Sequence, residues 1–131
     1  MVAIDTNVLL RLLINDDELQ ASKARSLFET QADAGEFLWV ADIVLIELVW
    51  ALDRRYGRPR DEVCAALNAL TNNATVVAES SDCLHQAIAL YEQGPAGFAD
   101  CLLAVKAGMA GCNALRTFDK KMRALPGVKL L

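Results

Sequence analysis

Short apolar runs alternate with helical patterns along the whole chain of 131 residues. The runs have the length of strands, and the stretches between them have the apolar periodicity of helices. We predict strands at residues 2–4, 37–41, 74–78, 114–118 and 128–131. The predicted helices cover residues 8–14, 18–34, 42–56, 60–71, 80–93, 98–110 and 119–125. Strands and helices therefore alternate through the chain.

Polar residues and glycines mark the ends of several predicted helices. Thr6 and Asp42 are expected to cap the first and third helices, and the polar residues 15–17 to cap the second. Gly35 and Gly57 are expected to end the second and third helices.

Strands joined through helices need crossover connections, which produce a parallel sheet. We predict a three-layer α/β/α fold with a mostly parallel central sheet of four or five strands. A chain of this length fits one domain, residues 1–131. Ligands bind to such open sheets at the carboxyl ends of the strands, so polar residues at these positions are candidates for a functional site.

Composition narrows the class of protein. Apolar residues make up 54% of the chain, which is enough for a core and argues against disorder. The longest apolar stretch, residues 37–52, is interrupted by Asp42 and Glu47, and the N-terminus lacks the pattern of a signal peptide. We therefore expect a cytoplasmic protein with no membrane partner.

The cysteine and histidine content excludes several kinds of site. The only histidine is His85, so a Ser-His-Asp mechanism would need His85 as its base. The cysteines are far apart and lack the spacing of a structural zinc site, so we expect buried, reduced thiols. The four cysteines are Cys64, Cys83, Cys101 and Cys112.

Three acidic residues follow predicted strands or begin a helix. Asp5 follows the first predicted strand and Asp119 the fourth, which places both at the ligand-binding edge of the sheet. Asp100 lies in the first turn of its helix. Each of these three acids also has a purely structural interpretation, as a turn, cap or first-turn residue. For two further acids, Asp61 and Asp82, the structural interpretation is preferred.

Glu47 is harder to explain structurally. Its helical neighbours include Ile43, Trp50 and Ala51, and no lysine or arginine lies three or four positions away. A charged carboxylate in an apolar stripe is costly unless it is paired or binds a metal. Converging carboxylates are the ligands that Mg²⁺ or Mn²⁺ prefers, so the acids indicate metal-assisted hydrolysis of a phosphate ester.

The net charge of −4 does not favour nucleic-acid binding through bulk charge, but carboxylates that bind divalent cations are an exception. Four segments, in order, resemble the PIN-domain nucleases. They are residues 4–11 around Asp5, 46–52 around Glu47, 98–104 around Asp100 and 117–119 ending at Asp119. The resemblance spans essentially the whole chain and is greatest to the VapC-type toxins of bacterial toxin–antitoxin pairs.

The resemblance implies a metal-dependent endoribonuclease that uses Mg²⁺ (or Mn²⁺) and produces 5′-phosphate and 3′-hydroxyl ends. It implies an RNA substrate of the tRNA or rRNA class, a cognate antitoxin that alone contacts DNA, and a homodimer. Asn7 and Thr117 would be supporting polar residues. The implied catalytic and metal-binding acids are Asp5, Glu47, Asp100 and Asp119.

Basic and aromatic residues have two interpretations each. The basic residues near the acids could contact RNA phosphates or could simply be solvated. These are Arg54, Arg55, Arg58 and Lys120. Trp39 and Trp50 are expected to pack in the core or an interface rather than to stack on bases. The leucines of residues 8–14, with Leu27 and Phe28, could line an apolar groove for a partner helix or pack in the core.

Other functional classes remain open at this point. A catalytically silent, partner-binding PIN-like domain would use the same acids structurally. A receiver-type signalling domain needs paired acids near the first strand and leaves Glu47 unexplained. A phosphatase of the haloacid-dehalogenase kind needs a second aspartate where this chain has Asn7.

Overall fold

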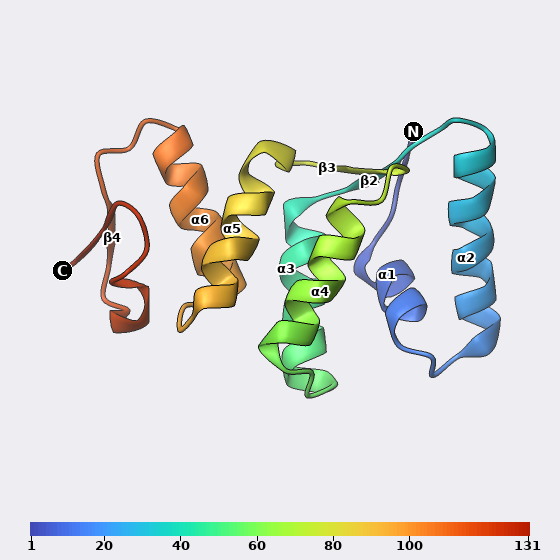
Figure 1. The fold of residues 1–131 in the computed structure, drawn as a ribbon, viewed down its shortest axis with the longest axis horizontal. Coiled ribbons are helices and arrows are strands. Elements are labelled where there is room, and N and C mark those ends of the chain that lie inside the picture. Colours follow the sequence, from blue (N-terminus) through green and yellow to red (C-terminus); the bar gives the residue numbers. More distant parts are fainter. The chain divides into compact units, whose positions relative to one another are not determined.

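The computed structural model describes residues 1–131, and the chain divides into two units, Met1–Ser81 and Asp82–Leu131. The order of elements alternates as the hydrophobic pattern predicts (Figure 1). No helix has both the length and the apolar character needed to cross a bilayer.

A small parallel sheet organises the first unit. Its strands are β1 (Val2–Ala3), β2 (Leu38–Val40) and β3 (Val76–Ala78), in the order β1-β2-β3. Both neighbouring pairs are parallel. Leu38 and Val40 of the central strand are fully buried, as expected for a strand that is paired on both edges.

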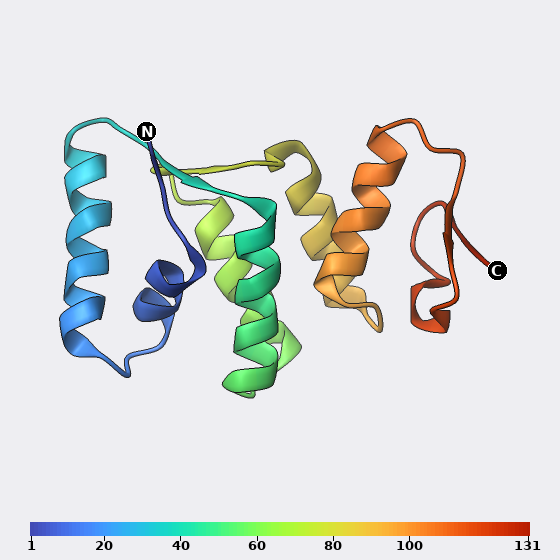
Figure 2. The same ribbon diagram turned by 180° about the vertical axis from the view of Figure 1, so that it is seen from behind.

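Five helical segments complete the first unit. They are α1 (Thr6–Leu13), α2 (Glu18–Asp33), α3 (Asp42–Trp50), the π-helix η1 (Ala51–Arg55) and α4 (Arg60–Thr71). Helix α1 lies between α2 and α3, and α3 runs beside α4 (Figures 1 and 2). Leu9 of α1, Leu45 and Leu48 of α3 and Leu67 of α4 are almost completely buried, so these helices share one apolar core.

Two predicted helix caps are wrong. The N-cap of α1 is Asp5, whose Oδ1 accepts hydrogen bonds from the backbone N–H groups of Asn7 and Val8. Thr6 is the first residue of the helix, and its hydroxyl donates a hydrogen bond to Glu47 of α3. The N-cap of α3 is Ala41, without a side-chain bond. Asp42 is instead buried in the first turn, because its carboxylate accepts a hydrogen bond from Ser80 Oγ at 2.7 Å.

The predicted helix over residues 42–56 changes type part-way. After Trp50 the helix widens into η1, where the N–H of Tyr56 donates to the carbonyl of Ala51, five residues earlier, at 3.1 Å. Gly57 ends the segment with a φ of 61°, a conformation that glycine adopts without strain. The predicted endpoint is therefore confirmed, whereas the π turn has no counterpart in the sequence pattern.

The second unit contains two helices and a strand pair. Helices α5 (Ser81–Gln93) and α6 (Phe98–Met109) lie side by side, and β4 (Leu115–Thr117) pairs in parallel with β5 (Val128–Leu130) (Figures 1 and 2). The predicted helix over residues 119–125 shrinks to one 3₁₀ turn, η2 (Lys120–Met122). All five predicted strands form and all pair in parallel, so the predicted α/β class is confirmed. The strands form a sheet of three and a separate pair, where the prediction had one central sheet of four or five strands.

None of the four cysteines forms a disulfide. Cys64, Cys83 and Cys101 are buried, as expected for reduced thiols of a core. The prediction is wrong for Cys112, which is exposed. It follows α6 directly after Gly111, whose φ of 84° turns the chain out of the helix.

Candidate active site

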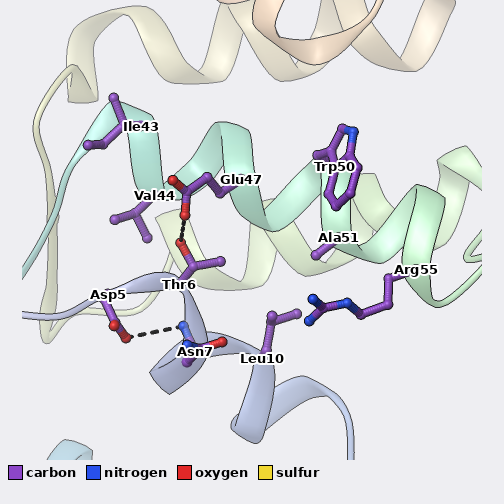
Figure 3. Close-up of a pocket in the computed structure, with 10 residues that line it drawn as sticks. All are labelled: Asp5, Thr6, Asn7, Leu10, Ile43, Val44, Glu47, Trp50, Ala51 and Arg55. Atoms are coloured by element: carbon purple, nitrogen blue, oxygen red, sulfur yellow. Dashed lines mark hydrogen bonds between the residues drawn. The ribbon is translucent and has the colours of Figure 1, made fainter.

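A hollow of about 400 Å³ opens in the first unit between the start of α1 and the exposed face of α3 and η1 (Figure 3). Ten residues line it, and Asp5 and Glu47 are the acids among them. The pocket therefore contains two of the four predicted acidic residues.

Asp5 is held by the backbone at the junction of β1 and α1. Its Oδ1 accepts the N–H groups of Asn7 at 3.1 Å and Val8 at 3.3 Å, two of the donors that every helix N-terminus leaves unpaired. Asp5 makes no ion pair, and its second oxygen makes no hydrogen bond. The capping role thus orients the carboxylate and leaves Oδ2 available to a ligand.

Glu47 lies in the middle of α3 and is held by α1. Thr6 Oγ1 donates to Glu47 Oε2 at 2.7 Å, and Glu47 Oε1 has no hydrogen-bond partner (Figure 3). The expected apolar burial of Glu47 is wrong, because Ile43 and Trp50 beside it are 68% and 61% exposed. A cost of burial therefore does not identify Glu47 as a functional residue. What identifies it as a candidate is that it lines the same pocket as Asp5.

Thr6 is a site residue that the sequence interpretation missed. Its side chain is buried, and its hydroxyl connects α1 to the carboxylate on α3. No local signal in the sequence could have found it, because its partner Glu47 lies on another helix. Asn7, predicted to support the acids, lines the same pocket and donates its backbone N–H to Asp5.

The other two predicted acids, Asp100 and Asp119, lie in the second unit at the starts of helical segments. Asp100 lies half-buried in the first turn of α6. Asp119 caps η2, where its Oδ1 accepts the N–H of Lys121 at 2.9 Å. Its own N–H donates to Thr117 Oγ1 at 3.0 Å, so the predicted supporting residue Thr117 does contact Asp119.

Neither unit by itself brings three His, Cys, Asp or Glu side chains together. The first unit contributes Asp5 and Glu47 to one pocket, and the second contributes Asp100 and Asp119 separately. That all four acids converge stays a prediction, and so does the assignment of residues 1–131 to a single domain.

Residues 2–128 match the model of the PIN domain. The chain belongs to the PIN domain family. It is also 30% identical over 125 residues to the VapC ribonuclease of Aquifex aeolicus (strain VF5). The aligned residues make up 95% of this chain and 92% of that protein. The resemblance to VapC-type PIN domains is thereby confirmed, and the receiver-type and phosphatase alternatives are excluded.

The basic residues of this PIN domain differ in their surroundings. Arg54 and Arg58 make long ion pairs with Asp53 at 3.6 Å and Glu62 at 3.7 Å, all exposed. Such pairs are typical of solvated helix ends and contribute little to stability. Arg55 lines the pocket, and its guanidinium points toward Leu10 on α1 (Figure 3).

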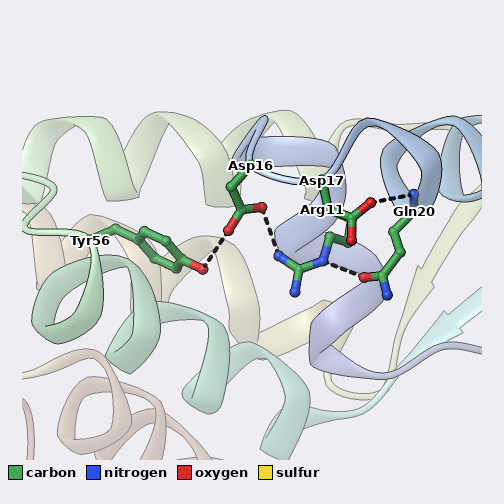
Figure 4. Close-up of polar contacts among 5 residues, drawn as sticks. All are labelled: Arg11, Asp16, Asp17, Gln20 and Tyr56. Carbon is green, nitrogen blue, oxygen red and sulfur yellow. Dashed lines mark hydrogen bonds and ion pairs between the residues drawn. The ribbon is translucent and has the colours of Figure 1, made fainter.

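A polar network braces the two walls of the pocket (Figure 4). Arg11 of α1 donates to Asp16 at 2.8 Å and to Gln20 at 2.6 Å, and Tyr56, directly after η1, donates to Asp16 at 3.5 Å. Desolvation acts to lower the pKa of Arg11, but the charge of Asp16 and the hydrogen bonds of Tyr56 and Asp16 outweigh it and raise the pKa. The network links α1 and α2 to the end of η1 beside Arg55.

Proposed function

We propose that this PIN domain is a metal-dependent endoribonuclease and the toxin of a type II toxin–antitoxin pair. The observation that carries the proposal is the pocket in which α1 and α3 present Asp5 and Glu47 together. The similarity to a VapC ribonuclease supports RNA as the substrate.

We propose that Mg²⁺ or Mn²⁺ is held by the carboxylates of Asp5, Glu47, Asp100 and Asp119. The first two fit such an ion, because each keeps one oxygen free of hydrogen bonds and neither is neutralised by an ion pair. Hard oxygen ligands of this kind suit small divalent cations. A bound divalent ion would lower the pKa of a water ligand and stabilise charge on a phosphate undergoing in-line attack.

The protein side chains then have distinct tasks. Two backbone N–H groups fix the carboxylate of Asp5, and the hydroxyl of Thr6 fixes that of Glu47. We assign Asn7 and Thr117 supporting roles beside Asp5 and Asp119. Preorganised groups of this kind lower the reorganisation that the transition state requires.

For the substrate we propose RNA of the tRNA or rRNA class, with phosphates contacted by Arg54, Arg55, Arg58 and Lys120. We further propose a cognate antitoxin, a homodimer and a cytoplasmic location, with DNA contacted only through the antitoxin. An apolar hollow of about 310 Å³ between α1, α2 and α4 supports a protein partner. Leu9, Leu12, Leu13 and Phe28 line it, whereas Leu10 and Leu27 of the predicted groove do not.

The test is cleavage of purified tRNA and rRNA by the full chain, with Mg²⁺ or Mn²⁺ and with EDTA. The proposal predicts metal-dependent fragments with 5′-phosphate and 3′-hydroxyl ends. Full activity in EDTA contradicts metal dependence. A protein that cleaves none of these RNAs, and whose melting temperature does not respond to either ion, is the catalytically silent partner-binding domain instead.

A further inference from the structure

Trp50 and Arg55 lie in the same pocket as the carboxylates of Asp5 and Glu47 (Figure 3). Trp50 is 61% exposed, although so large an apolar side chain is ordinarily well buried. Arg55 is also exposed, and it makes no ion pair or hydrogen bond. Of the two predicted roles for Trp50, core packing is therefore wrong within its own unit, and packing in an interface stays a prediction.

The π-helix η1 brings Arg55 to this face. In an uninterrupted α-helix, the position eight residues after Glu47 would be rotated about 80° away from it. The bond from Tyr56 N–H to the Ala51 carbonyl adds a residue to the last turn and reduces this rotation. Trp50, three residues after Glu47, already shares its face. Glu47, Trp50 and Arg55 consequently line one pocket.

We propose that Trp50 and Arg55 form a nucleotide subsite, in which the indole stacks on an unpaired base of the RNA and the guanidinium binds an adjacent phosphate. The inference deepens the proposed ribonuclease function and rests on it. An exposed aromatic ring is a general means of binding bases that are not stacked in a duplex. A planar guanidinium suits the geometry of phosphate oxygens.

Charge favours this assignment over an apolar partner. The chain has a net charge of −4, so an RNA phosphate gains no attraction from the protein as a whole. A cation beside the acids supplies local attraction for a phosphate, and Arg55 is the basic residue that lines this pocket. A base in a duplex has both faces covered by its neighbours, so the subsite selects unpaired nucleotides.

The direct test is tryptophan fluorescence of the full chain in EDTA, where cleavage is suppressed. The probe is a single-stranded oligoribonucleotide of about ten nucleotides, within the span of known single-strand sites. We expect it to quench the emission of the wild-type protein and of Trp39→Phe, which keeps Trp50. The variant Trp50→Phe keeps only Trp39, which is half-buried in β2, and should show no quenching.

Affinity supplies the second readout. Trp50→Ala and Arg55→Gln are each expected to raise the Kd for the single strand about 10-fold. Arg25→Gln is the charge-matched control, because Arg25 lies on α2 in an ion pair with Glu18, and its Kd should equal that of the wild type. The complementary duplex should bind more weakly than the single strand and be insensitive to Trp50→Ala.

Two results would overturn the subsite. One is an unchanged Kd in both variants while the wild-type protein still cleaves RNA, which leaves the proposed ribonuclease intact. The other is a change of oligomeric state on gel filtration of Trp50→Ala, which would make Trp50 a contact between copies. Weakened binding in both variants, with no cleavage by the wild type in Mg²⁺, supports the subsite and contradicts the ribonuclease.

Discussion

The two units of the chain hold their acidic residues in different ways. In Met1–Ser81, tertiary packing of α1 against α3 brings Asp5 and Glu47 to one pocket, and the Thr6–Glu47 hydrogen bond joins the two helices. In Asp82–Leu131, Asp100 lies in the first turn of α6, and Asp119 is oriented by local contacts as the cap of η2. Local structure can orient a carboxylate, but a multi-residue site needs tertiary contacts as well.

Removing one acid from each unit tests whether both units supply the active site, and it has the largest expected effect. Glu47→Gln and Asp100→Asn keep the size of the side chain and are expected to lower the rate of RNA cleavage about 10³-fold or more, because charge stabilisation of the transition state is lost. Asp61→Asn and Asp82→Asn are the matched controls in the first turns of α4 and α5, and both should cleave normally. A loss confined to one unit's variant would show that only that unit supplies the site.

Metal binding is also expected to raise the stability of the folded protein. A site that binds Mg²⁺ or Mn²⁺ only when folded gains about 2.7 kcal/mol of unfolding free energy at a metal concentration 100 times the Kd. We expect the melting temperature of the wild type to rise accordingly, and that of Glu47→Gln and Asp100→Asn to rise much less. An equal rise in all three proteins would mean that the metal binds elsewhere.

The Thr6–Glu47 bond tests whether α1 positions the acid on α3. Thr6→Val keeps the buried shape and removes the hydroxyl, and we expect about 10-fold slower cleavage, since a hydrogen bond to a charged group is lost. Thr6→Ser should restore the rate. If Thr6→Val and Thr6→Ser lose the same activity, the hydroxyl does not position Glu47.

Asp5 has two expected roles, as the N-cap of α1 and as a metal ligand. The effect of its cap on the free energy of unfolding is the smallest that we predict. Asp5→Ala removes the cap of α1 and should lower the free energy of unfolding by about 1 kcal/mol in urea denaturation, besides abolishing cleavage. Asp5→Asn keeps an oxygen for the N–H groups of Asn7 and Val8, so it should cleave as poorly but unfold like the wild type. Active Asp5→Asn protein would reduce Asp5 to a helix cap.

Much of the fold was predictable because local signals and tertiary packing agree. Helix α4 spans Arg60–Thr71 as predicted, and Gly35 and Gly57 have the positive φ of residues that end helices. The caps were less predictable. Asp42 has the chemistry of a cap, but Ser80, far along the chain, uses its carboxylate instead. Such a contact leaves no trace in the local sequence.

Two acids of the pocket were predictable from the sequence, whereas its other lining residues were not. Asp5 follows its strand as expected, and Glu47 lies on the expected helix. The sequence did not indicate the role of Thr6, because its partner lies on another helix. Nor did it indicate that Arg55 would share the pocket, because a π turn changes the helical period over only one turn.

Whether acids of both units bind one ion can be measured by titrating the isotope-labelled protein with Mn²⁺ and recording paramagnetic broadening of its amide resonances. We expect the amides next to Asp5, Glu47, Asp100 and Asp119 to broaden together at the same substoichiometric Mn²⁺ concentration. Broadening confined to the residues of one unit would contradict this expectation.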